Sequence, residues 1–238
     1  MKLQYLERAL AASRDGKPSA IATHLTSGLQ SLIEGTEIEG NLEIDITLKA
    51  GIQSALADDR SNTIETSSGN IFVEVFNPKL RCFIVGAVHI AQPLSRMFAE
   101  LDYQVTVIDP RTAWATDARF PQIELSTEWP DEALQRLKPD KRSAIITLTH
   151  DPKLDDPGLI EALKSPAFYI GALGSRKTHG SRLKRLEENG FNQQELSRIR
   201  GPVGLNIGAI SPAEIAISIL GEVTAVLHAD RIKVREPT

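Results

Sequence analysis

The pattern of hydrophobic positions divides the chain near residue 78. Before that point, apolar residues at helical spacing are mixed with short apolar runs. The spacing predicts helices over residues 5–16 and 46–59, and strands over residues 19–25, 28–33 and 70–80. Asn77-Pro78 closes the last strand with a turn signal. The pattern therefore predicts a small N-terminal α/β domain over residues 1–78.

From residue 79 onward, predicted strands and helices alternate regularly. The strands are continuous apolar runs, which are typical of a parallel sheet covered on both faces. They cover residues 82–86, 104–109, 143–150 and 167–171, and helices are predicted over 89–102, 131–137, 159–164, 175–190 and 213–229. This alternation predicts an α/β fold, a Rossmann-like doubly wound parallel sheet, as a second domain over residues 79–238.

Several of the predicted helices carry recognisable ends. Pro93 is tolerated only in the first turn of its helix. The spacing Asn192-x-x-Glu195 and the segment Ser211-Pro212-Ala213-Glu214 predict capped helix starts. The helix over residues 213–229 is apolar on more than one face. Burial within the domain and burial at a subunit interface explain that pattern equally well.

Polar, titratable and glycine residues cluster directly after the predicted strands. In doubly wound sheets, ligands bind at the carboxyl ends of the strands. The candidate binding residues are Gly86, Ala87, Val88 and His89 after the first strand, Asp109 and Arg111 after the second, Thr149, His150 and Asp151 after the third, and Gly171, Gly174, Ser175, Arg176 and Lys177 after the fourth. This clustering predicts a binding site at one edge of the sheet.

The first of these turns resembles a dinucleotide-binding loop of the G-x-G-x-x-G/A type. Gly86 supplies the first glycine and Ala91 the last small residue, but Val88 replaces the second glycine. A β-branched side chain there obstructs the approach of a pyrophosphate and avoids positive φ. The motif alone therefore favours a nucleotide loop and a structural turn equally.

Asp109 closes the second strand, with 22 residues between it and Gly86. A carboxylate at this distance can accept hydrogen bonds from both ribose hydroxyls of a nucleotide. The alternative role is capping of the segment that follows, before Pro110. We favour the ribose role.

A second anion site is predicted at residues 174–177, where two glycines precede a basic helix. Free N–H groups and the helix dipole attract an anion there, and the basic side chains add charge. The alternative is a solvated turn whose basic residues face water. We prefer the anion site, because basic residues in a first turn oppose the helix dipole unless a negative group is bound.

The remaining chemical candidates are single residues. His89 and His150 are the best general acid–base candidates, although a histidine in a turn often has a structural role. Asn206 and Gly208 form either a loop that approaches a ligand closely or a tight connector. No ligand spacing of the zinc type is present, so we expect no metal site.

The composition of the chain excludes several classes of protein. The chain of 238 residues is 41% hydrophobic and 24% charged, with a net charge of −4, so nucleic-acid binding is not expected. A single cysteine, Cys82, excludes an internal disulfide and a CxxC metal site. The charged start is unlike a secretory signal, and no apolar run reaches the length of a membrane span. We therefore expect a cytoplasmic protein.

Five linked stretches together resemble the XdhC/CoxF family of accessory proteins. They are FVEVFNPKLRCFIVGAVHIA, VTVIDPRTAWATDARFP, TLTHDPKLD, FYIGALGSRKTHGSRLKRLEENGF and GPVGLNIGAISPAEIAISILGEV. The resemblance covers the last two thirds of the chain, in order. It implies a maturation factor that serves a molybdenum hydroxylase such as xanthine dehydrogenase or carbon monoxide dehydrogenase. It also implies binding of the molybdenum cofactor and a homodimer.

The chain departs from the family pattern in three places. A GxGH turn is common in the family, whereas Gly86-Ala87-Val88-His89 lacks its second glycine. Many members have a GLDIG segment, in which Asn206 here replaces the aspartate. Residues 26–33 and 39–43 look like shortened remnants of N-terminal family segments, without their cysteine. The resemblance is therefore closer to a shortened CoxF-like member.

The preferred hypothesis is an accessory factor that binds a dinucleotide, the molybdenum cofactor, or both. FAD is the leading dinucleotide and NAD(P) the other. Its partners would be an apo molybdenum hydroxylase, a cysteine desulfurase and a second copy of the chain. The alternatives are an NAD(P)-dependent oxidoreductase with His150 as acid, and a dimeric nucleotide sensor without turnover.

Overall fold

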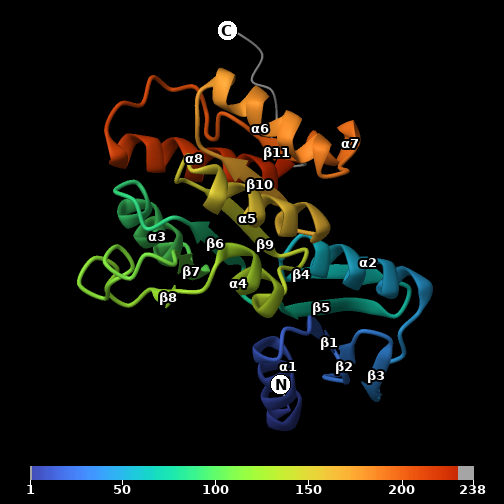
Figure 1. Cartoon of the computed structure of the whole chain (residues 1–238). Helices are drawn as coiled ribbons and strands as arrows, with labels where there is room; N and C mark the ends of the chain where they lie inside the picture. Colours follow the sequence, from blue (N-terminus) through green and yellow to red (C-terminus); the bar gives the residue numbers. More distant parts are fainter. Residues whose placement is uncertain (1, 230–238) are drawn as a thin grey trace, which may run out of the picture. The chain divides into compact units, whose positions relative to one another are not determined.

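The computed structural model describes residues 2–229, whose contacts form two compact units that divide between Lys79 and Leu80. We call them the N-terminal unit and the C-terminal unit, and each is described by itself (Figure 1). As independent domains, the ranges 1–78 and 79–238 stay a prediction. Among the described residues, no helix is both long and apolar enough to cross a membrane.

The N-terminal unit is a five-stranded antiparallel sheet with one helix on each face. Alternate residues of its strands point to opposite faces, so Ile21 and Leu32 pack with one helix while Ala20 and Val73 lie in the cluster of the other. The strand order is β3-β2-β1-β5-β4. The elements are α1 (Leu3–Arg14), β1 (Ser19–His24), β2 (Gln30–Glu34), β3 (Glu37–Gly40), α2 (Ile46–Ala57), β4 (Asn62–Thr66) and β5 (Gly69–Phe76).

The C-terminal unit contains a six-stranded parallel sheet, which confirms the predicted fold class. Its order is β11-β10-β9-β6-β7-β8. With β6 counted as the first strand, this is the order 3-2-1-4-5-6 of dinucleotide-binding sheets read from the other edge. The strands are β6 (Arg81–Val85), β7 (Gln104–Ile108), β8 (Glu124–Ser126), β9 (Ser143–Thr147), β10 (Tyr169–Ala172) and β11 (Ile199–Arg200).

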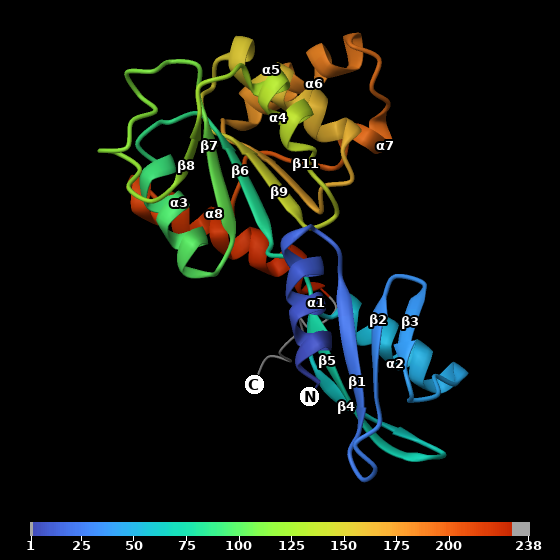
Figure 2. The ribbon, with the colours of Figure 1, turned by 90° about the horizontal axis from the view of Figure 1, so that it is seen from below.

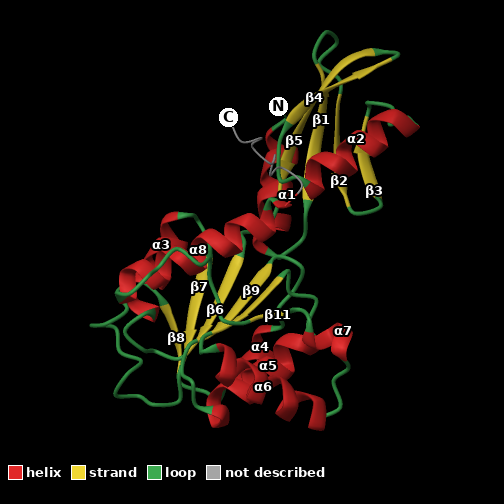
Figure 3. Cartoon of the chain, turned by 90° about the horizontal axis from the view of Figure 1, so that it is seen from above, coloured by secondary structure: helices red, strands yellow, loops and turns green. Residues whose placement is uncertain are grey.

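Helices cover both faces of the parallel sheet, as Figures 2 and 3 show. Cys82 and Ile84 lie in one core cluster, and their neighbours Phe83 and Val85 lie in the other. The first cluster packs beneath α3 (Ala91–Glu100) and α8 (Pro212–Leu227). The second packs beneath α4 (Pro130–Leu137), α5 (Pro152–Lys164), α6 (Arg176–Glu188) and the short α7 (Gln193–Leu196).

The predicted helix ends are confirmed by their caps. Asn192 and Glu195 form a capping box at α7, and Ser211 and Glu214 form another at α8, where Pro212 is the first helical residue. Helix α8 buries Ala216, Ile219 and Val223 within its own unit, which explains part of its apolar character. Ile217 on the same helix stays exposed.

The hydrophobic pattern did not predict four short strands. Strands β3, β4, β8 and β11 have two to five residues and few fully buried side chains, so they lack an apolar run. Strand β9 is shorter than predicted. It ends at Thr147, and the next three residues, 148–150, lead toward α5 in a connection that we call the turn after β9.

Candidate functional site

The strand order reverses at β6 and β9, which pair in parallel and end at the same edge of the sheet. The turn after β6 touches the turn after β9 there. Gly86 has φ +106°, and a Cβ on it would lie 2.4 Å from Cγ2 of Thr149. Only glycine fits this position, both for its backbone angle and for lack of space. The glycine therefore allows two turns to pack together at the point where such sheets bind ligands.

A buried carboxylate fixes the turn after β6. Asp109 at the end of β7 is fully buried and accepts the N–H of Ala87 at 2.8 Å. It also accepts three hydrogen bonds from Arg111, from the backbone N–H at 3.0 Å, Nε at 2.8 Å and Nη2 at 2.7 Å. Burial opposes the charge, but these hydrogen bonds prevail and lower the pKa of Asp109. The carboxylate thus braces the turn in this structure.

Arg119 holds the carbonyl group of Ala87, the residue whose N–H group is bound by Asp109. Nη1 of Arg119 donates to the carbonyl oxygen of Ala87 at 2.8 Å and to that of Trp114 at 2.6 Å. The guanidinium groups of Arg119 and Arg111 each lie over the Trp114 ring, 5.3 and 5.2 Å from its centroid. His89 is exposed and meets the Trp114 ring edge-on. Side chains from the loop after β7 therefore clamp the turn.

Val88 adopts this turn without strain. Its φ is not positive, and its side chain packs against the apolar cluster beneath α3 and α8. The positive φ falls on Gly86 instead. A valine at the position of the second glycine is thus accommodated by the turn, and its side chain contributes to the core.

The turn after β9 is built around a second buried carboxylate. Asp155 in α5 accepts Oγ1 of Thr149 at 2.6 Å and the N–H groups of Thr149 and His150 at 3.2 and 3.1 Å. Its burial raises its pKa, which the hydrogen bonds and Arg182 oppose. His150 has φ +63°, a left-handed conformation that is uncommon for a residue other than glycine. Asp151 caps α5 by accepting the N–H of Lys153 at 3.0 Å.

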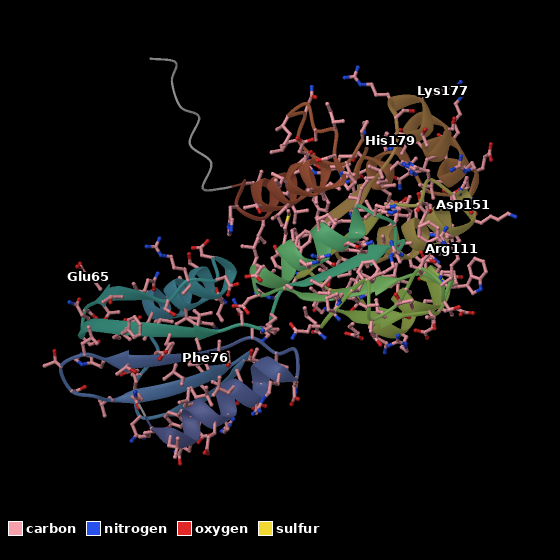
Figure 4. All side chains as sticks on the ribbon, turned by 90° about the vertical axis from the view of Figure 1, so that its left-hand side faces the viewer. Glu65, Phe76, Arg111, Asp151, Lys177 and His179 are labelled. Carbon is pink, nitrogen blue, oxygen red and sulfur yellow. The ribbon has the colours of Figure 1, made fainter. Side chains whose placement is uncertain are left out.

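A cationic cavity of about 260 Å³ lies between this turn and the side of α6. It brings together His150 and Lys177 from the predicted set, while Gly174 approaches it from the side, its Cβ position 3.7 Å from Nδ1 of His150. Figure 4 shows Lys177 and Asp151 along one edge of the C-terminal unit. The cavity is lined by His150, Pro152, Asp155, Lys177, Thr178, Ser181, Arg182 and Arg185.

The other predicted residues lie outside the cavity lining. Ser175 caps α6 by accepting the N–H of Thr178, and Arg176 is exposed in the first turn. A Cβ on Gly171 would lie 2.6 Å from Val203 and within 3.0 Å of the Tyr169 ring, so this glycine serves packing. Asn206 and Gly208 are exposed in the loop before α8. Within residues 2–229, no group of three or more metal-ligating side chains gathers.

Two arginines of the cavity, Arg182 and Arg185, were not predicted from the sequence. Arg182 shares the buried face of α6 with Leu186, four residues later, and is only 1% exposed. That spacing is the one signal that could have indicated its inward position. Arg185 forms a bidentate pair with Asp156 in α5, at 2.5 and 2.9 Å. The two arginines follow the side of the helix, whereas the prediction concentrated on its first turn.

These features define a Rossmann-type unit with a braced glycine turn and a cationic cavity. Comparison with known proteins gives the family. The model of the XdhC Rossmann domain matches residues 82–223, and the chain belongs to this family. The family assignment made from the sequence is thereby confirmed.

Individual relatives agree with the family assignment. The molybdenum cofactor insertion chaperone PaoD of Escherichia coli (strain K12) is 33% identical over 162 residues, which is 68% of this chain and 45% of that protein. A protein of Bacillus subtilis (strain 168), described as a probable xanthine dehydrogenase subunit, is 32% identical over 155 residues, 65% of this chain and 45% of that protein. The chain thus spans less than half the length of these relatives.

A solved structure supports the fold over almost the whole chain. It is described as a xanthine dehydrogenase from Bacillus halodurans, and it matches 96% of this chain and 68% of its own with a TM-score of 0.76. Its sequence identity is 23%, so the likeness speaks for the fold alone.

Proposed function

We propose that the chain is an accessory factor in the maturation of a molybdenum hydroxylase of the xanthine dehydrogenase or carbon monoxide dehydrogenase type. It holds the molybdenum cofactor while the cofactor is sulfurated or inserted into the apoenzyme. The observation that carries this proposal is the 33% identity to an insertion chaperone over 68% of the chain. The role is that of a carrier rather than of a turnover enzyme, and we place it in the cytoplasm.

The cavity supports a cargo of this chemical kind. The organic part of the molybdenum cofactor is a pterin that carries a phosphate monoester or a nucleotide diphosphate. A cavity with three basic side chains, Lys177, Arg182 and Arg185, at the ligand-binding edge of the sheet suits such an anion. His89 and His150 stand on either side of the switch point as candidate acid–base groups for the cargo.

A dinucleotide finds less support at the glycine turn as it is arranged here. The N–H of Ala87 is taken by Asp109, and the Asp109 carboxylate already accepts Arg111. FAD or NAD(P) in the usual pose would require Arg111 to leave Asp109 so that ribose could replace it. Binding of FAD, or of NAD(P), therefore belongs to the proposal only as a second ligand that rearranges this pair.

The proposal includes protein partners. The apo hydroxylase receives the cargo, a cysteine desulfurase supplies the sulfur, and a second copy of the chain completes a CoxF-like homodimer. Exposed apolar side chains on the loop before α8 and on its first turns support a protein contact at that place. They are Leu205, Ile207, Ile210 and Ile217.

The test is production of a molybdenum hydroxylase with and without this chain in cells that make the cofactor. We expect the enzyme made without the chain to be folded but deficient in molybdenum, as measured by elemental analysis of the purified protein. Full molybdenum content and activity without the chain would overturn the proposal. A flavin absorbance band in the purified chain would establish the second ligand.

The alternative of an NAD(P)-dependent oxidoreductase rests on the strand order of the sheet, which dinucleotide-binding enzymes share. Reduction of NAD+ or NADP+ during oxidation of a small alcohol or hydroxy acid would establish this alternative. Tight nucleotide binding without turnover would instead support the dimeric sensor.

A further inference from the structure

Two of the three guanidinium nitrogens of Arg182 have no hydrogen-bond partner among the described residues. The residue is 1% exposed, and its Nη2 donates to the carbonyl oxygen of Leu173 at 2.8 Å and lies 3.4 Å from Oδ2 of Asp155. Its Nε and Nη1 have no hydrogen-bond partner within the part of the chain that the structure describes. Buried donors are rarely left open in folded proteins, and those of a charged group are especially expensive. The hydrogen bond to Leu173 accounts for only one of the three guanidinium nitrogens of Arg182.

The surroundings of Arg182 favour a negative ligand. Lys177 lines the same cavity from the first turn of α6, and its side chain forms no ion pair with another described residue. Thr178 and Ser181 add hydroxyl groups to the lining. Asp155 is partly satisfied by the turn after β9, and Arg185 is held by Asp156. Lys177 and the two buried nitrogens of Arg182 that lack a partner among the described residues thus remain for an anion, which would reach those nitrogens after a small shift of the side chain.

We propose that this cavity is a binding site for a phosphate monoester group, with Arg182 as its anchor and Lys177 as the second cation. The identity of the ligand rests on the proposed function, in which the group is the phosphate of the cargo. The site itself rests on the open donors and the cavity.

The size of the cavity limits what it holds. Sites for whole cofactors and drug-sized ligands occupy roughly 300–1,000 Å³. A volume of about 260 Å³ takes a phosphate and the atoms next to it, while the rest of the ligand extends outward. The guanidinium donors of arginine are fixed in one plane, so Nε and Nη1 of Arg182 can donate to an anion while Nη2 stays with the carbonyl oxygen of Leu173.

The experiment measures binding of inorganic phosphate by isothermal titration calorimetry to the full chain in phosphate-free buffer. Arg182→Met keeps the volume and removes the donors, and we expect about tenfold weaker binding or more. Lys177→Met changes an exposed residue, so it should fold normally, and we expect binding to weaken about threefold or more. The matched control is Lys184→Met, which removes an exposed charge from the same helix outside the cavity and should change affinity less than about twofold.

Two results would overturn the site. One is equal phosphate affinity in the wild type and in Lys177→Met. The other is equal affinity in the wild type and in a folded Arg182→Met or Arg182→Lys. Arg182→Lys keeps the charge but lacks the planar set of donors. Thermal unfolding of each variant without phosphate shows whether it is folded.

A second measurement separates the site from the proposed function. The molybdenum content of the chain purified from cofactor-producing cells is compared between the wild type and Lys177→Met. Loss of both phosphate binding and molybdenum is the expected result. Loss of phosphate binding with unchanged molybdenum would keep the site and overturn its assignment to the cargo. Displacement of bound phosphate by AMP or NADPH would then assign the site to a nucleotide.

Discussion

The turn after β6 and the cavity beside α6 lie at the same edge of one sheet, and each contains a buried charged side chain. In the turn, Asp109 accepts four hydrogen bonds from Ala87 and Arg111, so its charge is fully used by the protein. In the cavity, Arg182 has two nitrogens without a partner among the described residues. The difference teaches that the protein's own side chains brace the glycine turn, although this turn resembles a nucleotide loop. The proposed anion site lies instead where a buried cation has donors without a partner among the described residues.

The largest effect is expected from Gly86→Ala. The new Cβ would lie 2.4 Å from Thr149 at a φ of +106°, so the two turns must separate. We expect the free energy of unfolding to fall by about 2–4 kcal/mol, measured by urea denaturation. The control is Gly180→Ala in α6, where a Cβ meets nothing within 4 Å. It should raise stability by about 0.5–1 kcal/mol because alanine favours a helix. Unchanged stability of Gly86→Ala would contradict the close packing of the two turns.

The next effect is expected from Asp109→Asn, which weakens the brace without changing its shape. At pH 7 we expect a loss of about 2 kcal/mol in the free energy of unfolding, since Arg111 is partly exposed and can find water. The folded-state pKa of Asp109 is lowered, so its contribution is present above the usual pKa of about 3.9 and is lost as the pH falls through the folded value. The difference between wild type and variant should therefore be constant from pH 7 to about 5 and shrink below about 4. A difference that grows on acidification would show that the carboxylate is not held as described.

A smaller effect is expected from Val88→Gly, which separates the turn from ligand binding. Loss of a partly buried side chain and added freedom in the unfolded chain should lower stability by about 1–2 kcal/mol. Phosphate affinity should stay within about twofold of the wild type, since Val88 lies outside the cavity lining. Stronger binding of NAD in this variant would show instead that a nucleotide reaches the turn and that Val88 obstructs it.

The smallest effect on stability is expected from His150→Gly, a change in the lining of the cavity. Glycine accepts the φ of +63° without strain but gains freedom in the unfolded chain, so stability should change by less than about 1 kcal/mol. His150→Val should lower it by about 1–2 kcal/mol, because a β-branched residue resists that conformation. Thermal unfolding of the two variants gives the comparison. Equal stability would show that the turn does not enforce this angle.

The sequence could predict the features that depend on local pattern. Apolar runs located β6, β7, β9 and β10, and the cap signals located the starts of α7 and α8. Strands such as β3 and β11 could not be found in this way, because their sequences contain no apolar run. They form only because they pair with a neighbouring strand. Tertiary contact decides these elements.

The candidate site was predicted only in part for a similar reason. Polar residues at strand ends indicated the edge of the sheet at which the cavity lies, and His150 and Lys177 line that cavity. The role of Asp109 depends on which donors reach it, and Ala87 is distant in the sequence. Arg182 was missed because a basic residue in a basic helix is ordinarily exposed. Its burial depends on α5 and the turn after β9, and periodicity within α6 cannot reveal those partners.

The stacking of Trp114 against Arg111 and Arg119 gives the molecule a built-in optical reporter. The chain has two tryptophans, Trp114 and Trp129, so replacing Trp129 with phenylalanine leaves one indole beside the brace. Release of Arg111 from Asp109 would change the surroundings of that indole, and its emission would shift in step. The fluorescence of a single side chain can thus report, in real time, whether a ligand opens the turn or leaves it closed.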